Sequence, residues 1–205
     1  LFPCPLCGSD RHREDYDFSD SRTAGAVPGY IVSCRACWLK FKIPARPEIP
    51  LAAYYADPAM YRDRDDVSEA EKEFAHILTV AERVAAPGGR LLDIGSGPGH
   101  FLAAAMRAGF RATGVEINPE LACMAAKSSG AEVVAGDGAA LTTVLAGREK
   151  SFDVLTLLDV LEHVSDPVAL LREASRFLAP GGTLLIYTPN HSGLIARTAA
   201  LIGRL

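Results

Sequence analysis

The sequence predicts an α/β protein built on a doubly wound, mostly parallel sheet, with a small cysteine-containing module in front of it. Two observations lead to this prediction. From residue 90 onward, short apolar runs alternate with amphipathic helical patterns, which is typical of a parallel sheet covered by helices on both faces. Residues 1–44 carry two Cys-x-x-Cys pairs instead. We therefore expect a module at 1–44, a linker and covering segment at 45–66, and the main domain at 67–205.

The composition is that of an ordinary globular protein. Of the 205 residues, 49% are hydrophobic and 22% are charged, and the net charge is −4. Because no apolar run reaches about 18 residues, no membrane-spanning helix is expected. The first residues lack the basic and apolar regions of a signal peptide, so a cytoplasmic location is expected. No segment forms the basic face that binds a phosphate backbone, which disfavours nucleic acid as a partner.

The two cysteine pairs, Cys4 with Cys7 and Cys34 with Cys37, have the spacing of a metal site. Four thiolates complete the tetrahedron that structural zinc prefers, and they leave no open position for catalysis. Two disulfides or a redox pair are the alternatives, but a reducing compartment disfavours the first and the duplication disfavours the second. We predict a structural Zn²⁺ in a zinc ribbon. The sequence between the pairs is polar and turn-rich, with a strand expected at 30–33.

Three prolines, Pro44, Pro47 and Pro50, exclude a long helix after the ribbon and mark the boundary. The covering segment that follows contains three tyrosines beside several acids: Tyr54, Tyr55 and Tyr61. It is interpreted as a packed surface helix or as a lid over a pocket, and both alternatives remain open.

Ser68 and Glu71 then have the form of a capping box at the start of a helix. Apolar residues follow at helical spacing: Phe74, Ile77, Leu78, Ala81 and Val84. We expect this helix to pack its apolar face against the sheet.

A glycine-rich loop, in the sequence LLDIGSGPGH, joins the first strand of the main domain to a helix. Gly95, Gly97 and Gly99 allow the chain to reverse sharply and a ligand to approach the backbone at a helix N-terminus. The dinucleotide-binding fingerprint is the alternative, but His100 stands where its third glycine would fall. Asp93, just before the loop, would be a poor neighbour for a pyrophosphate. A cationic ligand suits this acid better.

Five strands are expected in the main domain, at 90–94, 111–116, 131–135, 152–158 and 183–187. The helix before the last strand should have Asp166 as its N-cap. Its apolar face is expected to consist of Leu170, Leu171, Ala174, Phe177 and Leu178.

In such a sheet, ligands bind beyond the carboxyl ends of the strands. Acidic residues stand at four consecutive strand ends: Asp93, Glu116, Asp137 and Asp159. Each of them alone could simply cap the next helix. The four together indicate a binding site.

Four segments, LDIGSGPG, GVEIN, GDG and FDVLTLLDVLEHVSDP, together resemble the ordered motifs of class I S-adenosylmethionine-dependent methyltransferases of the small-molecule type related to ubiquinone-biosynthesis O-methyltransferases. The match runs from about residue 90 to residue 190. The resemblance implies a Rossmann-like fold, S-adenosyl-L-methionine as cofactor, and O- or C-methylation of a metabolite such as a sugar or quinone precursor. CPLCGS resembles the ribbon of a zinc-ribbon subset that includes deoxysugar C-methyltransferases and one group of ribosomal-RNA guanine methyltransferases.

The resemblance also implies residue roles. The methionyl part of the cofactor would be held by Asp93, Gly95, Ser96, Gly97 and Gly99; the ribose by Glu116, with Ile117 as a further contact; the adenine side by Asp137 and Gly138; and Leu158 and Asp159 would close over the cofactor. Two features depart from the family. Its sheet normally ends in an antiparallel hairpin, for which no sequence follows residue 205, and His100 occupies a place that is apolar in many members.

Methyl transfer from a sulfonium is an in-line displacement, so an enzyme supplies mainly proximity, orientation and a dry cavity. A hydroxyl or acidic-carbon acceptor also needs a base, and His163 is the candidate catalytic residue because its unperturbed pKa is about 6.5. A histidine that caps the loop is an equal alternative. Glu162 could orient His163, and Asn190 could line the pocket.

Two further histidine and cysteine positions have structural interpretations. His76 is expected to be structural, and Cys123 to be a small buried residue. Two other functions also stay open: ribosomal-RNA base methylation with the ribbon as a nucleic-acid grip, and a non-catalytic cofactor-fold binding protein. The sequence does not specify the oligomeric state.

Overall fold

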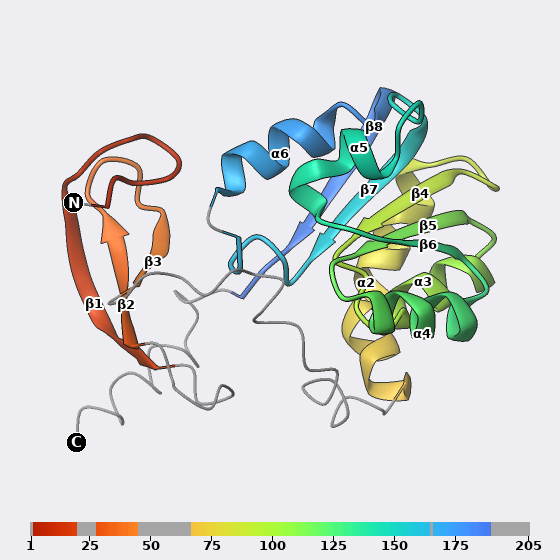
Figure 1. Cartoon of the computed structure of the whole chain (residues 1–205), viewed down its shortest axis with the longest axis horizontal. Coiled ribbons are helices and arrows are strands. Elements are labelled where there is room, and N and C mark those ends of the chain that lie inside the picture. The colour runs from red at the N-terminus through yellow and green to blue at the C-terminus, as the bar shows by residue number, and fades with distance from the viewer. Residues whose placement is uncertain (1, 20–27, 45–66, 165, 190–205) are drawn as a thin grey trace.

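The computed structural model describes residues 2–19, 28–44, 67–164 and 166–189. The described residues form two separate sheets, a three-stranded one from the N-terminal part and a five-stranded one from the rest (Figure 1). The tyrosines of the covering segment, and Asn190, lie outside the described residues. No helix in the described ranges combines the length and apolar character needed to cross a membrane.

The larger sheet has the order β6-β5-β4-β7-β8, and all its neighbouring strands are parallel. Its strands are β4 (Arg90–Ile94), β5 (Arg111–Glu116), β6 (Glu132–Ala135), β7 (Phe152–Leu158) and β8 (Leu178–Tyr187). Chain order reverses between β4 and β7, which is the switch point where such sheets bind ligands. The predicted doubly wound α/β fold is confirmed, and the predicted bounds of β4, β5 and β7 match the observed ones.

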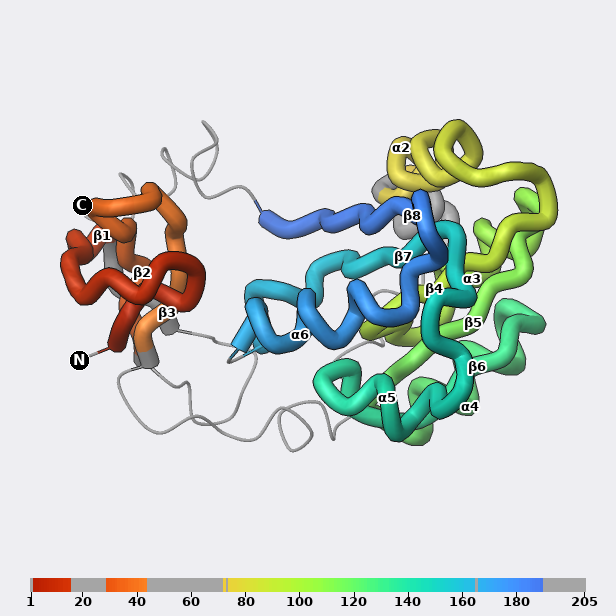
Figure 2. The backbone as a smooth tube through the Cα atoms, turned by 90° about the horizontal axis from the view of Figure 1, so that it is seen from above, coloured from red at the N-terminus to blue at the C-terminus, as the bar shows by residue number. Residues whose placement is uncertain are grey.

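Five α-helices of the described chain cover this sheet on both faces: α2 (Val67–Val84), α3 (His100–Arg107), α4 (Pro119–Ser129), α5 (Leu141–Val144) and α6 (Pro167–Ser175). Figures 1 and 2 place α2, α3 and α4 on one face, and α5 and α6 on the other. A short 3₁₀ turn, η2 (Gly138–Ala140), precedes α5.

Two apolar cores lie on the two faces of the sheet. Leu91 of β4 packs with Ile77 and Ala81 of α2, whereas its neighbour Leu92 belongs to the core that contains Leu170 of α6. This alternation is the period of a strand that is buried on both faces. The predicted packing of α2 is confirmed. The helix begins at Val67, so Ser68 lies inside it, and the side chains of Ser68 and Glu71 are outside the described part of the chain.

The last helix and strand differ from the prediction. Helix α6 ends at Ser175, and Leu178, which was assigned to its apolar face, pairs with Phe152 as the first residue of β8. The Pro-Gly-Gly sequence at 180–182 does not end the helix; it lies inside β8, where the register with β7 shifts. Gly181 has φ of +81°, a conformation that glycine adopts without strain. Asp166 caps α6 as predicted, since its carboxylate accepts the Ala169 N–H.

The N-terminal sheet consists of β1 (His12–Ser19), β2 (Pro28–Cys34) and β3 (Lys40–Pro44), paired antiparallel in this order. The prediction of a strand near 30–33 is confirmed by β2. Treating the segment before it as turn-rich was wrong for His12–Ser19, which forms β1 despite its charged residues. Asp15 of β1 helps to stabilise this strand. Its carboxylate accepts a hydrogen bond from Ser33 Oγ at 2.5 Å and forms an ion pair with Lys40 Nζ at 2.8 Å. These partners hold the pKa of Asp15 near 2 against the effect of burial.

Candidate functional site

The glycine loop after β4 is fixed over the carboxyl end of β5. The N–H groups of Gly95 and Ser96 both donate to the Val115 carbonyl, at 2.8 and 3.2 Å. Gly95, Gly97 and Gly99 all have positive φ, which explains why glycines recur there. At Gly95 a Cβ would also lie 2.6 Å from Val160 Cγ2, so the loop can pass close to the end of β7 only without a side chain.

Glu116 is the buried acid at the end of β5, and only 3% of it is exposed. Its Oε2 accepts the Gly97 N–H at 2.8 Å, and its Oε1 accepts the Asn118 N–H at 2.9 Å. Burial raises the pKa of this carboxyl, and the backbone donors oppose the rise. Each oxygen retains acceptor capacity, so the carboxylate can still accept hydroxyl groups from a ligand.

Asp93 lies beneath the loop and does not line the pocket. It is 2% exposed, and Thr156 Oγ1 donates to its Oδ1 at 2.7 Å. Burial, reinforced by the nearby charge of Glu116, raises the pKa of Asp93 to about 7. Its influence on a ligand would therefore be electrostatic and indirect.

Asp137 and Gly138 form the loop after β6. The Asp137 carboxylate accepts the Ala139 N–H at 2.8 Å and caps η2, so the capping role considered for a strand-end acid is realised here. A Cβ on Gly138 would come within 2.7 Å of Ile94 Cγ2. Glycine therefore allows this loop to lie against the end of β4, while both residues remain on the pocket wall.

An open pocket lies at the carboxyl ends of β4, β5, β6 and β7. Seven of the predicted site residues line it: Gly95, Glu116, Ile117, Asp137, Gly138, Asp159 and His163. The sequence analysis missed seven others: Ile94, Val115, Gly136, Ala139, Val160, Val164 and Leu170. Ile94 and Val115 stand at the ends of β4 and β5, and four others lie in the segments that follow β6 and β7. Only Leu170 lies on an α-helix, so helical periodicity could have indicated it.

Five predicted site residues are outside the pocket lining: Asp93, Ser96, Gly97, Gly99 and Leu158. Ser96 Oγ is buried without a hydrogen-bond partner. It lies next to Gly114, since a Cβ added to Gly114 would be 2.9 Å from Ser96 Oγ. Leu158 belongs to the core under α2 and α3. A Cβ on Gly99 would lie 2.8 Å from Ala125 of α4, so this glycine serves helix packing.

Asp159 and His163 line the pocket after β7, and Glu162 lies beside them in the sequence without lining it. Asp159 has φ of +53°, unusual for a residue with a side chain, and its N–H donates to the Tyr187 carbonyl at 2.9 Å. Burial raises the pKa of Glu162, and the neighbouring Asp159 carboxylate adds to this, while Thr188 Oγ1 donates to Glu162 Oε2 at 3.0 Å. His163 is half-buried on the pocket wall.

The other two positions with structural interpretations lie away from the pocket lining. His76 is exposed on α2, and its ring packs edge-on with the Tyr187 ring, with the two ring centroids 5.6 Å apart. Cys123 is exposed on α4, so its assignment as a buried residue was wrong. The buried face of α4 consists of Leu121, Ala122 and Ala125, and position 123 lies outside this face.

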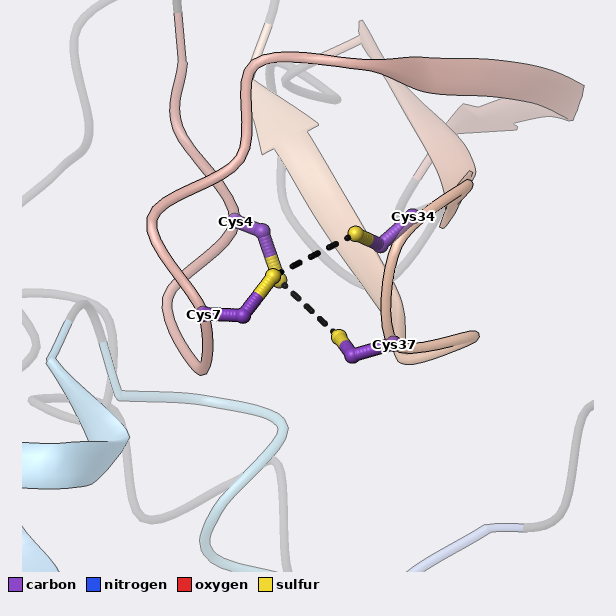
Figure 3. A group of neighbouring side chains, drawn as sticks. All are labelled: Cys4, Cys7, Cys34 and Cys37. Carbon is purple, nitrogen blue, oxygen red and sulfur yellow. Dashed lines mark hydrogen bonds between the residues drawn. The ribbon is translucent and has the colours of Figure 1, made fainter.

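The four ribbon cysteines meet at one end of the N-terminal sheet (Figure 3). The Sγ atoms of Cys4 and Cys37 are 3.6 Å apart, as are those of Cys7 and Cys34, and all four ligand atoms lie within 4.8 Å of one another. Four sulfurs at about 2.3 Å from a zinc ion would be separated by about 3.8 Å, so the cluster fits tetrahedral Zn²⁺. Backbone N–H groups of Cys37 and Ala36 lower the pKa of Cys34 to about 6.

The two cysteine turns share one backbone design. Gly8 N–H donates to the Cys4 carbonyl at 2.8 Å, and Trp38 N–H donates to the Cys34 carbonyl at 3.1 Å. In each pair, the residue that follows the second cysteine has a positive φ, +71° for Gly8 and +63° for Trp38. The repeated turn directs both cysteine pairs toward one point.

Comparison with known proteins gives a consistent family. A family model described as "Methyltransferase domain" matches residues 67–202. The ubiquinone biosynthesis O-methyltransferase of Xanthomonas campestris pv. campestris (strain B100) is 39% identical over 115 residues, which cover 55% of this chain and 48% of that protein. The chain thus spans about half the length of this curated relative.

Two solved structures share the fold. A protein of Pyrococcus horikoshii OT3 superposes with a TM-score of 0.56 at 24% identity, covering 66% of this chain and 64% of the other. A TehB-like SAM-dependent methyltransferase of Corynebacterium glutamicum has a TM-score of 0.51 at 19% identity, with 70% and 84% covered. At these identities the likeness shows the fold alone.

Proposed function

The chain belongs to the methyltransferase-domain family, and from this premise we propose that it transfers a methyl group from S-adenosyl-L-methionine to a small-molecule acceptor. The observation that carries the proposal is Glu116, a buried carboxylate that faces the pocket with acceptor capacity left after two backbone hydrogen bonds. Such a group can bind the two hydroxyls of a ribose. Ubiquinone biosynthesis in the Xanthomonas relative makes a hydroxylated metabolite a reasonable acceptor class.

We assign the cofactor contacts by position around the pocket. Glu116 and Ile117 would bind the ribose, Asp137 and Gly138 the adenine side, and Gly95 the methionyl part. Ser96, Gly97 and Gly99 would act through the shape of the glycine loop, and Asp93 would act from beneath it as a negative charge. Asp159 would border the reacting end, while Leu158 supports the strand from the core.

When bound, the cofactor supplies a methyl group on a sulfonium, which needs no further activation. The chain's own contribution is then orientation and exclusion of water by the apolar wall of Val160, Val164 and Leu170. His163 stands on the same wall and can take a proton from an acceptor hydroxyl or carbon acid. We propose it as the general base.

Calorimetric titration with S-adenosylhomocysteine tests the cofactor. The parent protein should bind it. Gly97→Arg should abolish binding, because the arginine side chain would fill the space of the cofactor. Glu116→Gln should weaken binding at least about tenfold, because charge-assisted hydrogen bonds to the ligand are lost. Glu120→Gln, at an exposed position on α4, is the matched control. Binding of NAD without any response to S-adenosylhomocysteine would reverse the assignment.

The role of His163 is tested by substitution with alanine. Removal of a general base lowers the rate by about 10²- to 10⁴-fold, so His163→Ala should lose methyl transfer by at least the lower bound while S-adenosylhomocysteine binding stays within a few-fold of the parent. Near-parent turnover would make the histidine structural. A collapse of cofactor affinity would place it in the cofactor half of the pocket.

We also propose that residues 1–44 are a separate module around one structural Zn²⁺ bound by Cys4, Cys7, Cys34 and Cys37. Such a site needs its cysteines reduced, so we also propose a reducing compartment, the cytoplasm. Elemental analysis should find about one zinc per chain. Cys34→Ser should lose it and Cys123→Ser, at the exposed cysteine outside the cluster, should retain it. Parent protein prepared without chelator and found free of zinc would refute the site.

A further inference from the structure

The short helix α5 has no cap of its own. Its N-cap residue is Ala140, whose side chain cannot accept a hydrogen bond, although the first N–H groups of any helix need acceptors. The acceptor comes from another element. Glu173 of α6 receives the Thr142 N–H on Oε1 at 2.7 Å, and the Thr142 hydroxyl donates to the same oxygen.

The same carboxylate is held in place from its other side. Arg176 Nη1 donates to Glu173 Oε2 at 3.3 Å, and the Glu173 side chain is only 17% exposed. The two Thr142 donors are the main cause that lowers the pKa of Glu173, with Arg176 adding to it. The group is therefore an ionised acceptor, and hydrogen bonds to an ionised acceptor are stronger than neutral ones.

Glu173 joins two walls of the pocket without being part of either. The loop Gly136–Ala139 lines the pocket and runs through η2 into α5, and Leu170, one turn before Glu173 on α6, lines the neighbouring part of the pocket. A Cβ on Gly138 would lie 3.5 Å from Leu170 Cδ1, which shows how closely the two walls approach. A fixed distance between α5 and α6 therefore also fixes the loop before α5 relative to Leu170, and both line the pocket.

We propose that Glu173 is a positioning residue for the cofactor: it caps α5 from α6 and so holds the 136–140 loop in the shape that receives the adenine side. This inference rests on the proposed cofactor. It concerns a residue that would touch neither the cofactor nor the reacting atoms. Thr142 and Glu173 are 31 residues apart in the sequence, so a search for local capping patterns does not find this hydrogen bond.

Titration with S-adenosylhomocysteine of the full chain tests this role. Glu173→Ala should raise the Kd about tenfold, because two hydrogen bonds to a charged acceptor are lost. Glu173→Gln keeps an oxygen acceptor and should remain within about threefold of the parent, and Thr142→Val, which loses only the hydroxyl donor, should raise the Kd about threefold. Arg176→Ala removes the weaker and more exposed partner of Glu173, at 3.3 Å, and should raise the Kd by less than Thr142→Val does. In turnover assays the KM for S-adenosylmethionine should rise while kcat at saturation is unchanged.

Each outcome separates this inference from the function on which it rests. If the parent binds S-adenosylhomocysteine and Glu173→Ala binds it equally well, the positioning role is wrong and the proposed cofactor stands. If the parent does not bind it, both fail. Should Glu173→Ala not fold, Thr142→Val decides: a parent-like Kd overturns the inference, and so does a fall in kcat without a change in KM.

Discussion

Two buried carboxylates, Asp93 and Glu116, lie beneath and beside the glycine loop, and they are satisfied in different ways. Glu116 accepts hydrogen bonds from backbone N–H groups, whereas Asp93 accepts one from the Thr156 hydroxyl. Burial raises the pKa of Asp93, and the nearby Glu116 charge adds to this because two negative charges disfavour each other. A positively charged ligand nearby would relieve this repulsion, which supports the proposed sulfonium cofactor.

Asp93 should make the stability of the apo protein depend on pH. Its folded pKa of about 7 lies above the ordinary value of 3.8, so the folded state binds the proton more tightly and the free energy of unfolding falls as pH rises between these values. Asp93→Asn removes this loss. The difference in free energy of unfolding between this variant and the parent should shift in favour of the variant by about 2 to 3 kcal/mol when the pH rises from about 5 to about 8. Denaturant unfolding at the two pH values measures the difference. A constant difference would mean that Asp93 is ionised throughout.

At the scale of elements, the tight contact between α3 and α4 depends on a glycine. Gly99 begins α3 with φ of +89°, and an added Cβ would meet the Cα and Cβ of Ala125 at 2.8 Å. Gly109 has the same φ of +89° after the end of α3, but an added Cβ would find nothing within 4 Å. Substitution of Gly109 therefore introduces backbone strain alone, whereas substitution of Gly99 introduces the same strain and a steric overlap with α4.

Gly109→Ala should lower the free energy of unfolding by about 1 kcal/mol, the cost of a positive φ for a residue with a Cβ. Gly99→Ala carries the same strain plus overpacking against α4, and should lose about 3 kcal/mol. Denaturant unfolding of both variants and the parent gives the comparison. Equal losses would show that α4 moves aside freely, and the packing role of Gly99 would be wrong.

Local sequence predicted the sheet well because each strand of the main domain is a short apolar run between breakers, as for β4, β5 and β7. Prediction failed where the deciding contact is distant. β1 is stabilised by Ser33 and Lys40 across the ribbon, and Leu178 joins β8 because β7 offers it a partner. The strand-end rule located Glu116 and Asp137 at the pocket, but motif likeness alone could not separate them from Asp93, which points beneath the loop.

At the scale of the whole molecule, the two sheets are stabilised by different means. The five-stranded sheet has an apolar core on each face, whereas the buried apolar residues of the described ribbon are only Cys4, Ile31, Val32 and Cys34. Two of these four are proposed metal ligands. So small a core cannot offset the conformational entropy of ordering three strands, so we expect this sheet to depend on the proposed Zn²⁺.

Chelation of the proposed zinc should therefore unfold the ribbon and leave the main domain folded. Hydrogen exchange followed by mass spectrometry can resolve this, because amides of β2 and β3 should lose protection after chelation while amides of β4 and β5 keep theirs. Cys34→Ser should reproduce the exchange pattern without chelator, and Cys123→Ser should behave like the parent. Retained protection of β2 in metal-free protein would show that the ribbon's hydrogen bonds, including those of Asp15, hold it without zinc. Loss of protection in β4 and β5 as well would show that the two sheets unfold as one cooperative unit.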